Sequence, residues 1–339
     1  MKNSSCDVLV LQFFPSTTEA EHLRSTYIAN CAINIFLCYT AVMMNIATIY
    51  AIKKTSCLPK TLETLLISLA ASDIGVGLLG QPFYTWLLFK GLSKTIPGCG
   101  TYMVFDAIIG LFTIMSFLGV LAVSADRFLA IHLHLRYQEL VTHKRVLTSV
   151  ISLWLASMVV SVAALWLSPD VKYLIVCAGG LVGFLLTTIA YSKIYITVRR
   201  LKNDIEGGEV QQEAYNREGI NFASVLKTTV GTFYVYLVFW ACYAPFFIST
   251  FSMKIYGRTI PLKGFFVWSI TLAYVNSTLN PVIYCWKMRH IRNAIIDTLR
   301  GICLVSNKAA SLQSSRAIRT ESVVHNTLAD TMAHCHESL

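Results

Sequence analysis

Charged residues are scarce in this chain of 339 residues. Asp, Glu, Lys and Arg together make up 14% of it, hydrophobic residues make up 55%, and the mean hydropathy is +0.58. A water-soluble globule of this length needs more charge than that to cover its surface. The composition therefore predicts a membrane protein.

Other features are missing as well, and each absence excludes a class of protein. No stretch alternates apolar and polar residues as the strands of a membrane β-barrel do. The ten cysteines are scattered singly, without the paired spacing of zinc sites. No histidine lies within a span to act as the base of an enzyme. Internal repeats and broken helices are not evident, so a membrane transporter is only a remote alternative.

Long apolar stretches are what the chain does have. Each exceeds the roughly 20 residues that a helix needs to cross a hydrocarbon core. They lie near residues 28–52, 62–89, 101–127, 148–168, 173–198, 226–252 and 262–286. The sequence predicts an all-α membrane protein, a seven-transmembrane-helix bundle over residues 28–300. Residues 1–27 form an N-terminal segment, and residues 301–339 form a polar tail that we expect to be disordered.

The distribution of basic residues predicts the orientation of the bundle. Of the 28 Lys and Arg residues, 20 fall on one side of the membrane, in the segments that follow the first, third, fifth and seventh spans. The side richer in Lys and Arg faces the cytoplasm, so we expect an extracellular N-terminus in the plasma membrane. The net charge of +10 is then explained by attraction to anionic inner-leaflet lipid, without any nucleic-acid partner.

Several polar residues lie at similar depths inside the spans, where they are expensive. The set comprises Asn45, Asp73, Ser116, Asn276, Ser277 and Asn280. One carboxylate among hydroxyl and amide oxygens is suited to a small hard cation such as Na⁺. A hydrogen-bond network that joins helices explains the same residues equally well.

A second group of polar residues lies at the cytoplasmic ends of the helices. Asp126 and Arg127 are adjacent in "LAVSADRFLAI", and Tyr191 and Tyr284 lie at the same level on the fifth and seventh spans. An arginine at a helix end commonly extends to the lipid headgroups. With several alternative partners nearby, it can instead act as a switch.

Five motifs together resemble the rhodopsin-like (class A) G-protein-coupled receptors. They are "SLAASD", "ADRFLAI", Trp154 in "SVISLWLAS", "FWACYAP" and "NSTLNPVIY", in the order and at the depths typical of that family. The resemblance implies a cell-surface receptor, not an enzyme. It also implies that the protein binds an extracellular small ligand and activates heterotrimeric G proteins, with arrestin as a further partner.

The resemblance also assigns roles to residues. The polar set around Asp73 matches the network that holds Na⁺ in the resting state of many members. Asp126, Arg127, Tyr191 and Tyr284 match the G-protein coupling switch, and Phe239, Tyr243 and Pro245 match the activation lever of the sixth helix. Three residues depart from the family pattern: Tyr243 replaces a tryptophan, Gly183 a proline, and Val225 the acid that clasps the arginine in some members.

The ligand pocket is expected at the outer halves of the third, fifth, sixth and seventh helices. Its predicted lining is Ile109, Gly110, Thr113, Ile175, Phe246, Phe247, Ile270 and Tyr274. Counted from Arg127, Ile109 occupies the position of the amine-binding aspartate of monoamine receptors. Counted from Cys99, Asp106 occupies it. The ligand is expected to be lipid-like, adenosine-like or a peptide, with a monoamine bound by Asp106 as the alternative.

Three modifications complete the expectations. By resemblance, Cys99 would form a disulfide with Cys177. Cys303 follows an amphipathic segment, "WKMRHIRNAIIDTLRGIC", which predicts a short cytoplasmic helix and a palmitoylation site. Asn3 begins an Asn-Ser-Ser glycosylation sequon.

Overall fold

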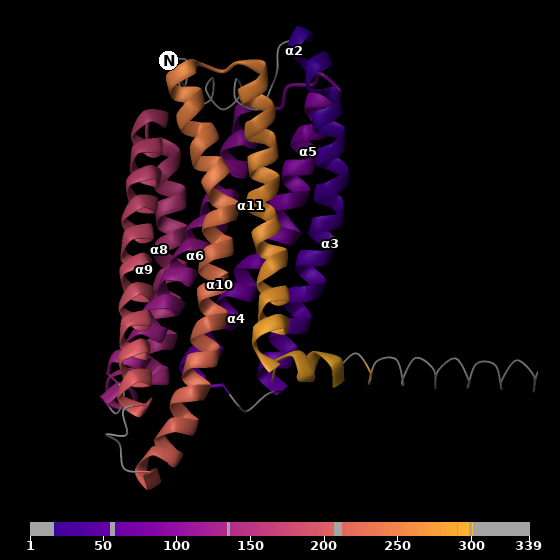
Figure 1. The fold of residues 1–339 in the computed structure, drawn as a ribbon. Coiled ribbons are helices and arrows are strands. Elements are labelled where there is room, and N and C mark those ends of the chain that lie inside the picture. The colour runs from indigo at the N-terminus through magenta and orange to yellow at the C-terminus, as the bar shows by residue number, and fades with distance from the viewer. Residues whose placement is uncertain are drawn as a thin grey trace, which may run out of the picture. The chain divides into compact units, whose positions relative to one another are not determined.

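Long helices make up nearly all of the protein that the computed structural model describes, which is residues 17–54, 58–133, 136–206, 212–289, 291–297 and 300 (Figure 1). No strand occurs among these residues. The main helices are α3 (Arg24–Lys54), α4 (Lys60–Gly75), α5 (Gln81–Leu92), α6 (Cys99–His132), α8 (His143–Ala163), α9 (Pro169–Glu206), α10 (Gln212–Tyr256) and α11 (Ile260–Lys287). A π-helical turn, η1 (Val76–Gly80), joins α4 to α5, and a short 3-10 turn, η3 (Ala164–Trp166), follows α8.

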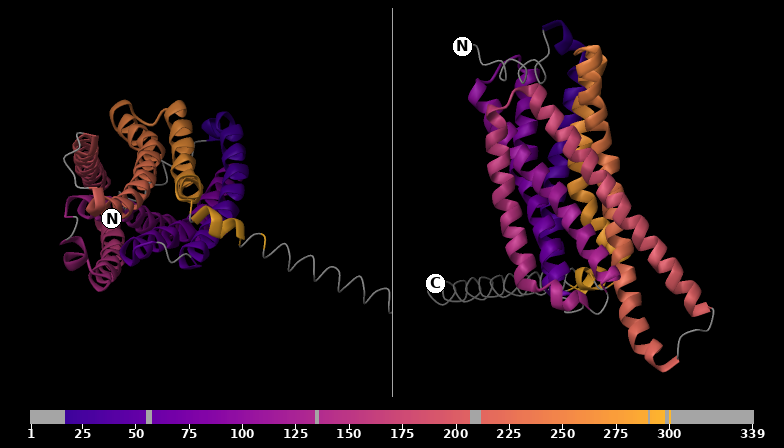
Figure 2. Two further views of the ribbon diagram at one scale, coloured as in Figure 1. Left: turned by 60° about the horizontal axis from the view of Figure 1, so that its bottom comes forward. Right: turned by 90° about the vertical axis from the view of Figure 1, so that its left-hand side faces the viewer.

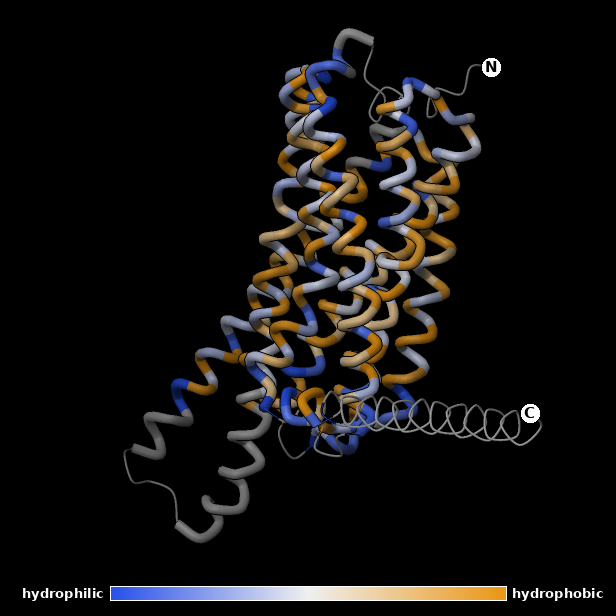
Figure 3. The backbone as a smooth tube through the Cα atoms, turned by 90° about the vertical axis from the view of Figure 1, so that its right-hand side faces the viewer, coloured by the Kyte–Doolittle hydropathy of each residue, from blue (hydrophilic) through white to orange (hydrophobic). Residues whose placement is uncertain are grey.

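Six of the described helical segments are long and apolar enough to cross a membrane. They are Arg24–Lys54, Lys60–Leu92, Cys99–His132, His143–Trp166, Leu174–Arg200 and Thr228–Tyr256. The seventh element of the bundle is α11, whose 28 residues include the polar stretch Asn276–Asn280. Figure 3 shows hydrophobic residues along the length of the helices. The predicted all-α, seven-helix membrane fold is confirmed.

Two short helices mark the two ends of the bundle. The helix α2 (Thr17–His22) precedes α3, and α7 (Tyr137–Leu140) lies between the end of α6 and the start of α8. We call these ends of the bundle the α2 end and the α7 end. The chain divides into two compact units, Met1–Arg292 and Asn293–Leu339, and the bundle belongs to the first. In the second unit residues 293–297 are helical, within the segment for which a short amphipathic helix is predicted.

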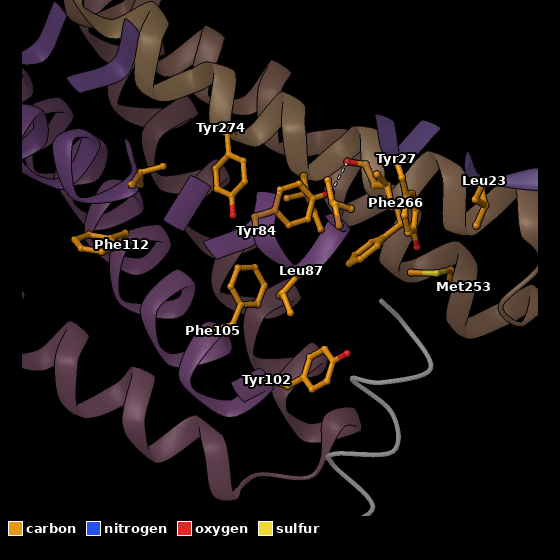
Figure 4. Close-up of a cluster of buried hydrophobic side chains, with 14 residues drawn as sticks. Leu23, Tyr27, Tyr84, Leu87, Tyr102, Phe105, Phe112, Met253, Phe266 and Tyr274 are labelled. Carbon is orange, nitrogen blue, oxygen red and sulfur yellow. Dashed lines mark hydrogen bonds between the residues drawn. The ribbon is translucent and has the colours of Figure 1, made fainter. Parts of the chain in front are cut away.

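Helix packing brings distant parts of the chain together. The helix α6 packs against α4, α8, α9 and α10, so it is the central helix of the bundle. The helix α11 lies between α10 and α3, as Figures 1 and 2 show. Near the α2 end, aromatic side chains from α3, α5, α6 and α11 form a buried apolar cluster, in which Tyr84, Phe105, Phe266 and Tyr274 are labelled in Figure 4.

Glycines allow the closest approaches between helices. In η1, a Cβ added to Gly77 would lie 2.8 Å from a side-chain carbon of Val42 and 3.2 Å from the carbonyl oxygen of Cys38. The thiol of Cys38 donates to the carbonyl oxygen of Gly77 at 2.9 Å. A π-helical turn commonly marks a functional position in a helix because it changes which residues face inward. Here it precedes Gln81, which is fully buried.

Gly183 shows why a small residue is needed in α9. A Cβ at this position would lie 2.2 Å from the ring of Phe117 on α6. The Phe117 ring in turn contacts Phe239 on α10, with 6.0 Å between ring centroids. Gly183, which stands where the resemblance leads one to expect a proline, therefore lets three helices meet around one phenylalanine.

Candidate functional site

Asp73 is the centre of the polar network in the middle of the bundle. Its side chain is fully buried, and its Oδ2 accepts a hydrogen bond from the Asn280 amide at 2.9 Å. Asn45 donates to the backbone carbonyl of Ser277 at 2.8 Å. The network therefore joins α3, α4 and α11, as the depths of these residues in the sequence predict.

The network also contains buried oxygen atoms that have no hydrogen-bond partner in the described part of the protein. They are Asp73 Oδ1, Asn45 Oδ1, Ser116 Oγ, Asn276 Oδ1 and Asn280 Oδ1. Buried polar groups are normally partnered, so five such oxygens in one region require an explanation. Carboxylate, amide and hydroxyl oxygens are the ligands of hard cations, and the residues present are compatible with Na⁺. The described residues contain no group of three or more His, Cys, Asp or Glu side chains of the kind that holds a transition metal.

Arg127 is buried at the α7 end of α6, with 1% of its surface exposed. Its Nε donates to Asp126 Oδ2 at 3.0 Å, and its Nη2 makes an ion pair with the same oxygen. Its Nη1 donates to the hydroxyl of Thr228 on α10 at 3.2 Å. Val225 supplies no acid to clasp the arginine, and α10 instead offers Arg127 the neutral hydroxyl of Thr228, three residues further along the helix.

Tyr137 is a residue of this site that the sequence did not reveal. Its hydroxyl donates to Asp126 Oδ1 at 2.6 Å and lies 2.9 Å from the hydroxyl of Thr61. Burial, and then the negative charge of Asp126, raise the pKa of Tyr137 to about 12. The phenol therefore stays protonated and remains a donor at neutral pH. Its only signal in the sequence is a tyrosine between two spans, which does not fix a partner.

The two predicted switch tyrosines are buried, and the hydrogen bonds of the Arg127 side chain described above go to Asp126 and Thr228. Tyr191 accepts a hydrogen bond from Ser124 at 3.3 Å and packs its ring against Phe233 and Tyr236. Tyr284 is 1% exposed, and no described group bonds its hydroxyl. Their movement toward Arg127 on activation stays a prediction.

The predicted activation lever lies on α10. The rings of Phe239 and Tyr243 stack, with 4.4 Å between centroids, and Pro245 lies inside the helix two residues beyond Tyr243. Because proline removes a backbone hydrogen bond, it weakens the helix at this level. Phe117 connects the pair to α6, so a displacement of Tyr243 would be felt at the α6–α10 contact.

Four predicted pocket residues gather in the buried apolar cluster near the α2 end. Ile270 and Tyr274 belong to the cluster, and Ile109 and Phe246 pack against it. Phe247 is not part of the cluster: its ring contacts that of Phe246, with 6.0 Å between centroids, and it also lies on Gly180 of α9 and near Trp240. Thr113 is half-buried on α6. The structure therefore unites α6, α10 and α11 in the predicted lining.

Two residues of the predicted lining point elsewhere. Ile175 on α9 is 52% exposed, on the outside of the bundle. A Cβ at Gly110 would lie 2.8 Å from the Ser161 hydroxyl, so this glycine faces α8. Both predictions fail because depth in the membrane was known from the sequence while the rotation of each helix was not.

Asp106 is paired with a cation from within the protein. Its carboxylate forms an ion pair with the ammonium of Lys172 on α9, and both side chains are about three-quarters buried. The structure thus places Asp106 between α6 and α9 with its charge already neutralised.

The cysteines require one correction. Cys99 is disulfide-bonded, whereas Cys177 carries a free thiol, as do Cys31, Cys38, Cys242 and Cys285. The predicted Cys99–Cys177 bridge is therefore wrong, since a short loop leaves Cys177 inside α9. The predicted sites at Asn3 and Cys303 lie outside the described residues.

Comparison with known proteins gives the class of protein. The family model for the 7 transmembrane receptor (rhodopsin family) matches residues 44–172 and 166–284, which is more than half of the chain. The chain belongs to this family: it is a G-protein-coupled receptor that binds small ligands, a multi-pass protein of the plasma membrane, and not an enzyme.

Individual relatives are distant but match over most of their length. The chain is 23% identical to adenosine receptor A3 of Ovis aries, over 88% of this chain and 97% of the relative. It is 25% identical to adenosine receptor A2b of Gallus gallus, over 80% and 87%, and to adenosine receptor A2a of Homo sapiens, over 79% and 71%.

Proposed function

We propose that this receptor recognises a small neutral ligand, of the nucleoside type, at the α2 end of the bundle. The α2 end then faces the outside of the cell, and the α7 end meets the G protein. The excess of Lys and Arg on the side of the α7 end supports this orientation.

The ion pair between Asp106 and Lys172 is the observation that supports the ligand class. A cationic amine would have to displace Lys172 before it could use Asp106, and this would leave a partly buried ammonium without its partner. A neutral ligand avoids that cost. The similarity to adenosine receptors makes a nucleoside the first ligand to test.

We propose in addition that the network around Asp73 holds Na⁺ in the resting receptor. Asp73, Ser116 and Asn280 would supply oxygen ligands, with Asn45, Asn276 and Ser277 close by. When bound, the cation would supply the positive charge that a lone buried carboxylate lacks. Arrestin binding to the Ser- and Thr-rich tail is a further proposal, on residues outside those described.

The proposed function is tested in cells that carry promiscuous G-protein reporters. Adenosine, the cationic amine serotonin and a lysophospholipid are applied at matched concentrations to cells with and without the receptor. We expect nucleotide exchange with adenosine or a related nucleoside. A response to serotonin alone would establish the monoamine alternative, and a response to the lysophospholipid alone would establish the lipid-like one.

A further inference from the structure

Gln81, at the start of α5, is buried without any hydrogen-bond partner for its side chain in the described part of the protein. Its side chain is 0% exposed, and neither Nε2 nor Oε1 is bonded. A buried amide left in this state costs stability at both atoms. An isolated packing role would be served better by methionine or leucine, so the amide points to a binding partner.

Contacts between α3 and α5 place Asn34 opposite Gln81. The two helices run antiparallel, and Cys31 contacts the carbonyl oxygen of Thr85 at 3.8 Å while Cys38 contacts that of Gly77 at 2.9 Å. Asn34 lies between the two cysteines on α3. Gln81 lies midway between Gly77 and Thr85, so the two amides are at the same level.

Contacts with α11 place Tyr274 at this level too. Asn34 donates to the hydroxyl of Thr271 at 2.8 Å, and Tyr274 follows Thr271 by three residues, on the same face of α11. The Tyr274 ring contacts that of Tyr84 edge to face, with 5.5 Å between centroids (Figure 4). Tyr84 follows Gln81 by three residues, so the two lie on the same side of α5. Asn34, Gln81 and Tyr274 therefore lie at one level on three packed helices, and we call these three residues the Gln81 cluster.

The Gln81 cluster has both donors and acceptors to offer. Asn34 Oδ1 and the Tyr274 hydroxyl, like the Gln81 amide, have no partner among the described residues. Asn34 and Tyr274 are themselves 0% and 5% exposed. The cluster contains no charged side chain, so its complement is a neutral group.

We propose that the Gln81 cluster is a subsite for a neutral amide-like edge, in which an N–H donor lies beside an acceptor. Such an edge is found in a primary carboxamide and in the pairing face of a nucleobase. The Gln81 carboxamide would bind it with two parallel hydrogen bonds, as one amide binds another, and the aromatic rings of Tyr84 and Tyr274 would cover its flat face. The proposal rests on the proposed function in that the ligand enters from the α2 end.

The test uses benzamide as the probe and purified full-length receptor in lipid nanodiscs. Saturation-transfer NMR measures binding of benzamide and of N,N-dimethylbenzamide, which keeps the ring and the acceptor but has no N–H donor. We expect benzamide to bind wild-type receptor at least fivefold more tightly than the dimethyl compound. Gln81→Met should weaken benzamide about tenfold, the loss expected for two hydrogen bonds, and leave the dimethyl compound nearly unchanged.

Thr85→Val is the matched control on α5. The Thr85 hydroxyl donates to the carbonyl oxygen of Gln81 at 2.8 Å within the helix, so its loss should leave benzamide binding as in the wild type. The melting temperature provides an independent readout. Gln81→Met should hold or raise the melting temperature of the ligand-free receptor, because it removes an unpartnered buried amide.

Two outcomes would overturn the proposal. If benzamide binds wild type and Gln81→Met equally, Gln81 does not read the amide. If benzamide does not bind the wild type, or binds it no more tightly than the dimethyl compound does, the cluster is not a subsite for an amide edge and is only a packing feature. Either result can occur while adenosine still activates the receptor, so failure of the subsite is distinguishable from failure of the proposed function.

Discussion

Arg127 on α6 donates a hydrogen bond to Thr228 on α10 at 3.2 Å, so a hydroxyl joins the two helices at the α7 end. We propose that activation opens the bundle at this end by moving α10 away from α6. The contact would be lost in that movement, so it would stabilise the closed arrangement.

Thr228→Val should raise signalling in the absence of agonist. The substitution keeps the shape of the side chain and removes the acceptor. A hydrogen bond to a charged group is worth about 1.5–3 kcal/mol, so the active fraction should rise roughly tenfold or more if it starts small. Basal G-protein activation at equal surface expression measures this. Thr40→Val, whose hydroxyl bonds only within α3, should behave as wild type; an unchanged Thr228→Val would mean that Asp126 alone holds Arg127.

Tyr137→Phe should also raise basal activity, by roughly twofold to fivefold, because Asp126 loses a donor while Arg127 keeps its ion pair. The pH dependence is specific. The raised pKa of Tyr137, about 12, means that its stabilising contribution is fully present below the ordinary tyrosine pKa of about 10. It is lost progressively as the pH rises above about 10 and through the folded-state value.

Melting curves of wild type and Tyr137→Phe should therefore differ by a constant amount between pH 6 and pH 9. The difference should shrink above pH 10. A difference that disappears between pH 6 and pH 8 would show that another group, such as a histidine, controls this contact.

Sodium should weaken agonist binding if the Asp73 network holds the cation in the resting state. We expect the affinity of purified receptor for its agonist to be several times lower in NaCl than in the same concentration of N-methyl-D-glucamine chloride. Asp73→Asn should remove the difference, because the amide does not supply the charge. If affinity is equal in the two salts, the buried oxygens serve only to join the helices.

Some of these contacts were predictable from the sequence, and the reason is depth. Asp73 and Asn280 lie at similar distances along their apolar stretches, and antiparallel helices bring equal depths together. The partner of Arg127 was not predictable in this way, because the rotation of α10 decides whether residue 225 or Thr228 faces α6. Lys172 and Tyr137 lie near helix ends and between spans, where no apolar period indicates a direction.

Asp106→Ala should leave the potency of a neutral agonist within about threefold of wild type and lower the melting temperature by a few degrees. The reason is that Lys172 loses its partner while the pair is only partly buried. Exchanging the two charges, with Asp106→Lys and Lys172→Asp together, should restore the melting temperature. A loss of agonist potency of tenfold to a hundredfold in Asp106→Ala would instead identify Asp106 as a direct ligand contact.

Gly183→Ala should destabilise the receptor although alanine favours a helix. The added methyl group would lie 2.2 Å from the Phe117 ring, so the ring must move, and overpacking of this kind costs about 1–3 kcal/mol. Gly179→Ala is the matched control one turn earlier on α9, since nothing lies within 4 Å of its added Cβ. We expect the melting temperature to fall for Gly183→Ala and to stay or rise slightly for Gly179→Ala.

The smaller side chain of Phe117→Leu should make room for the methyl group. The double variant Gly183→Ala with Phe117→Leu should therefore lose less stability than the two single variants predict together, which is the coupling expected for residues in direct contact. Because Phe117 also touches Phe239, the same variants should shift basal signalling. Purely additive changes in melting temperature would show that the methyl group and the Phe117 ring do not compete for the same space, and the proposed three-helix junction would then be wrong.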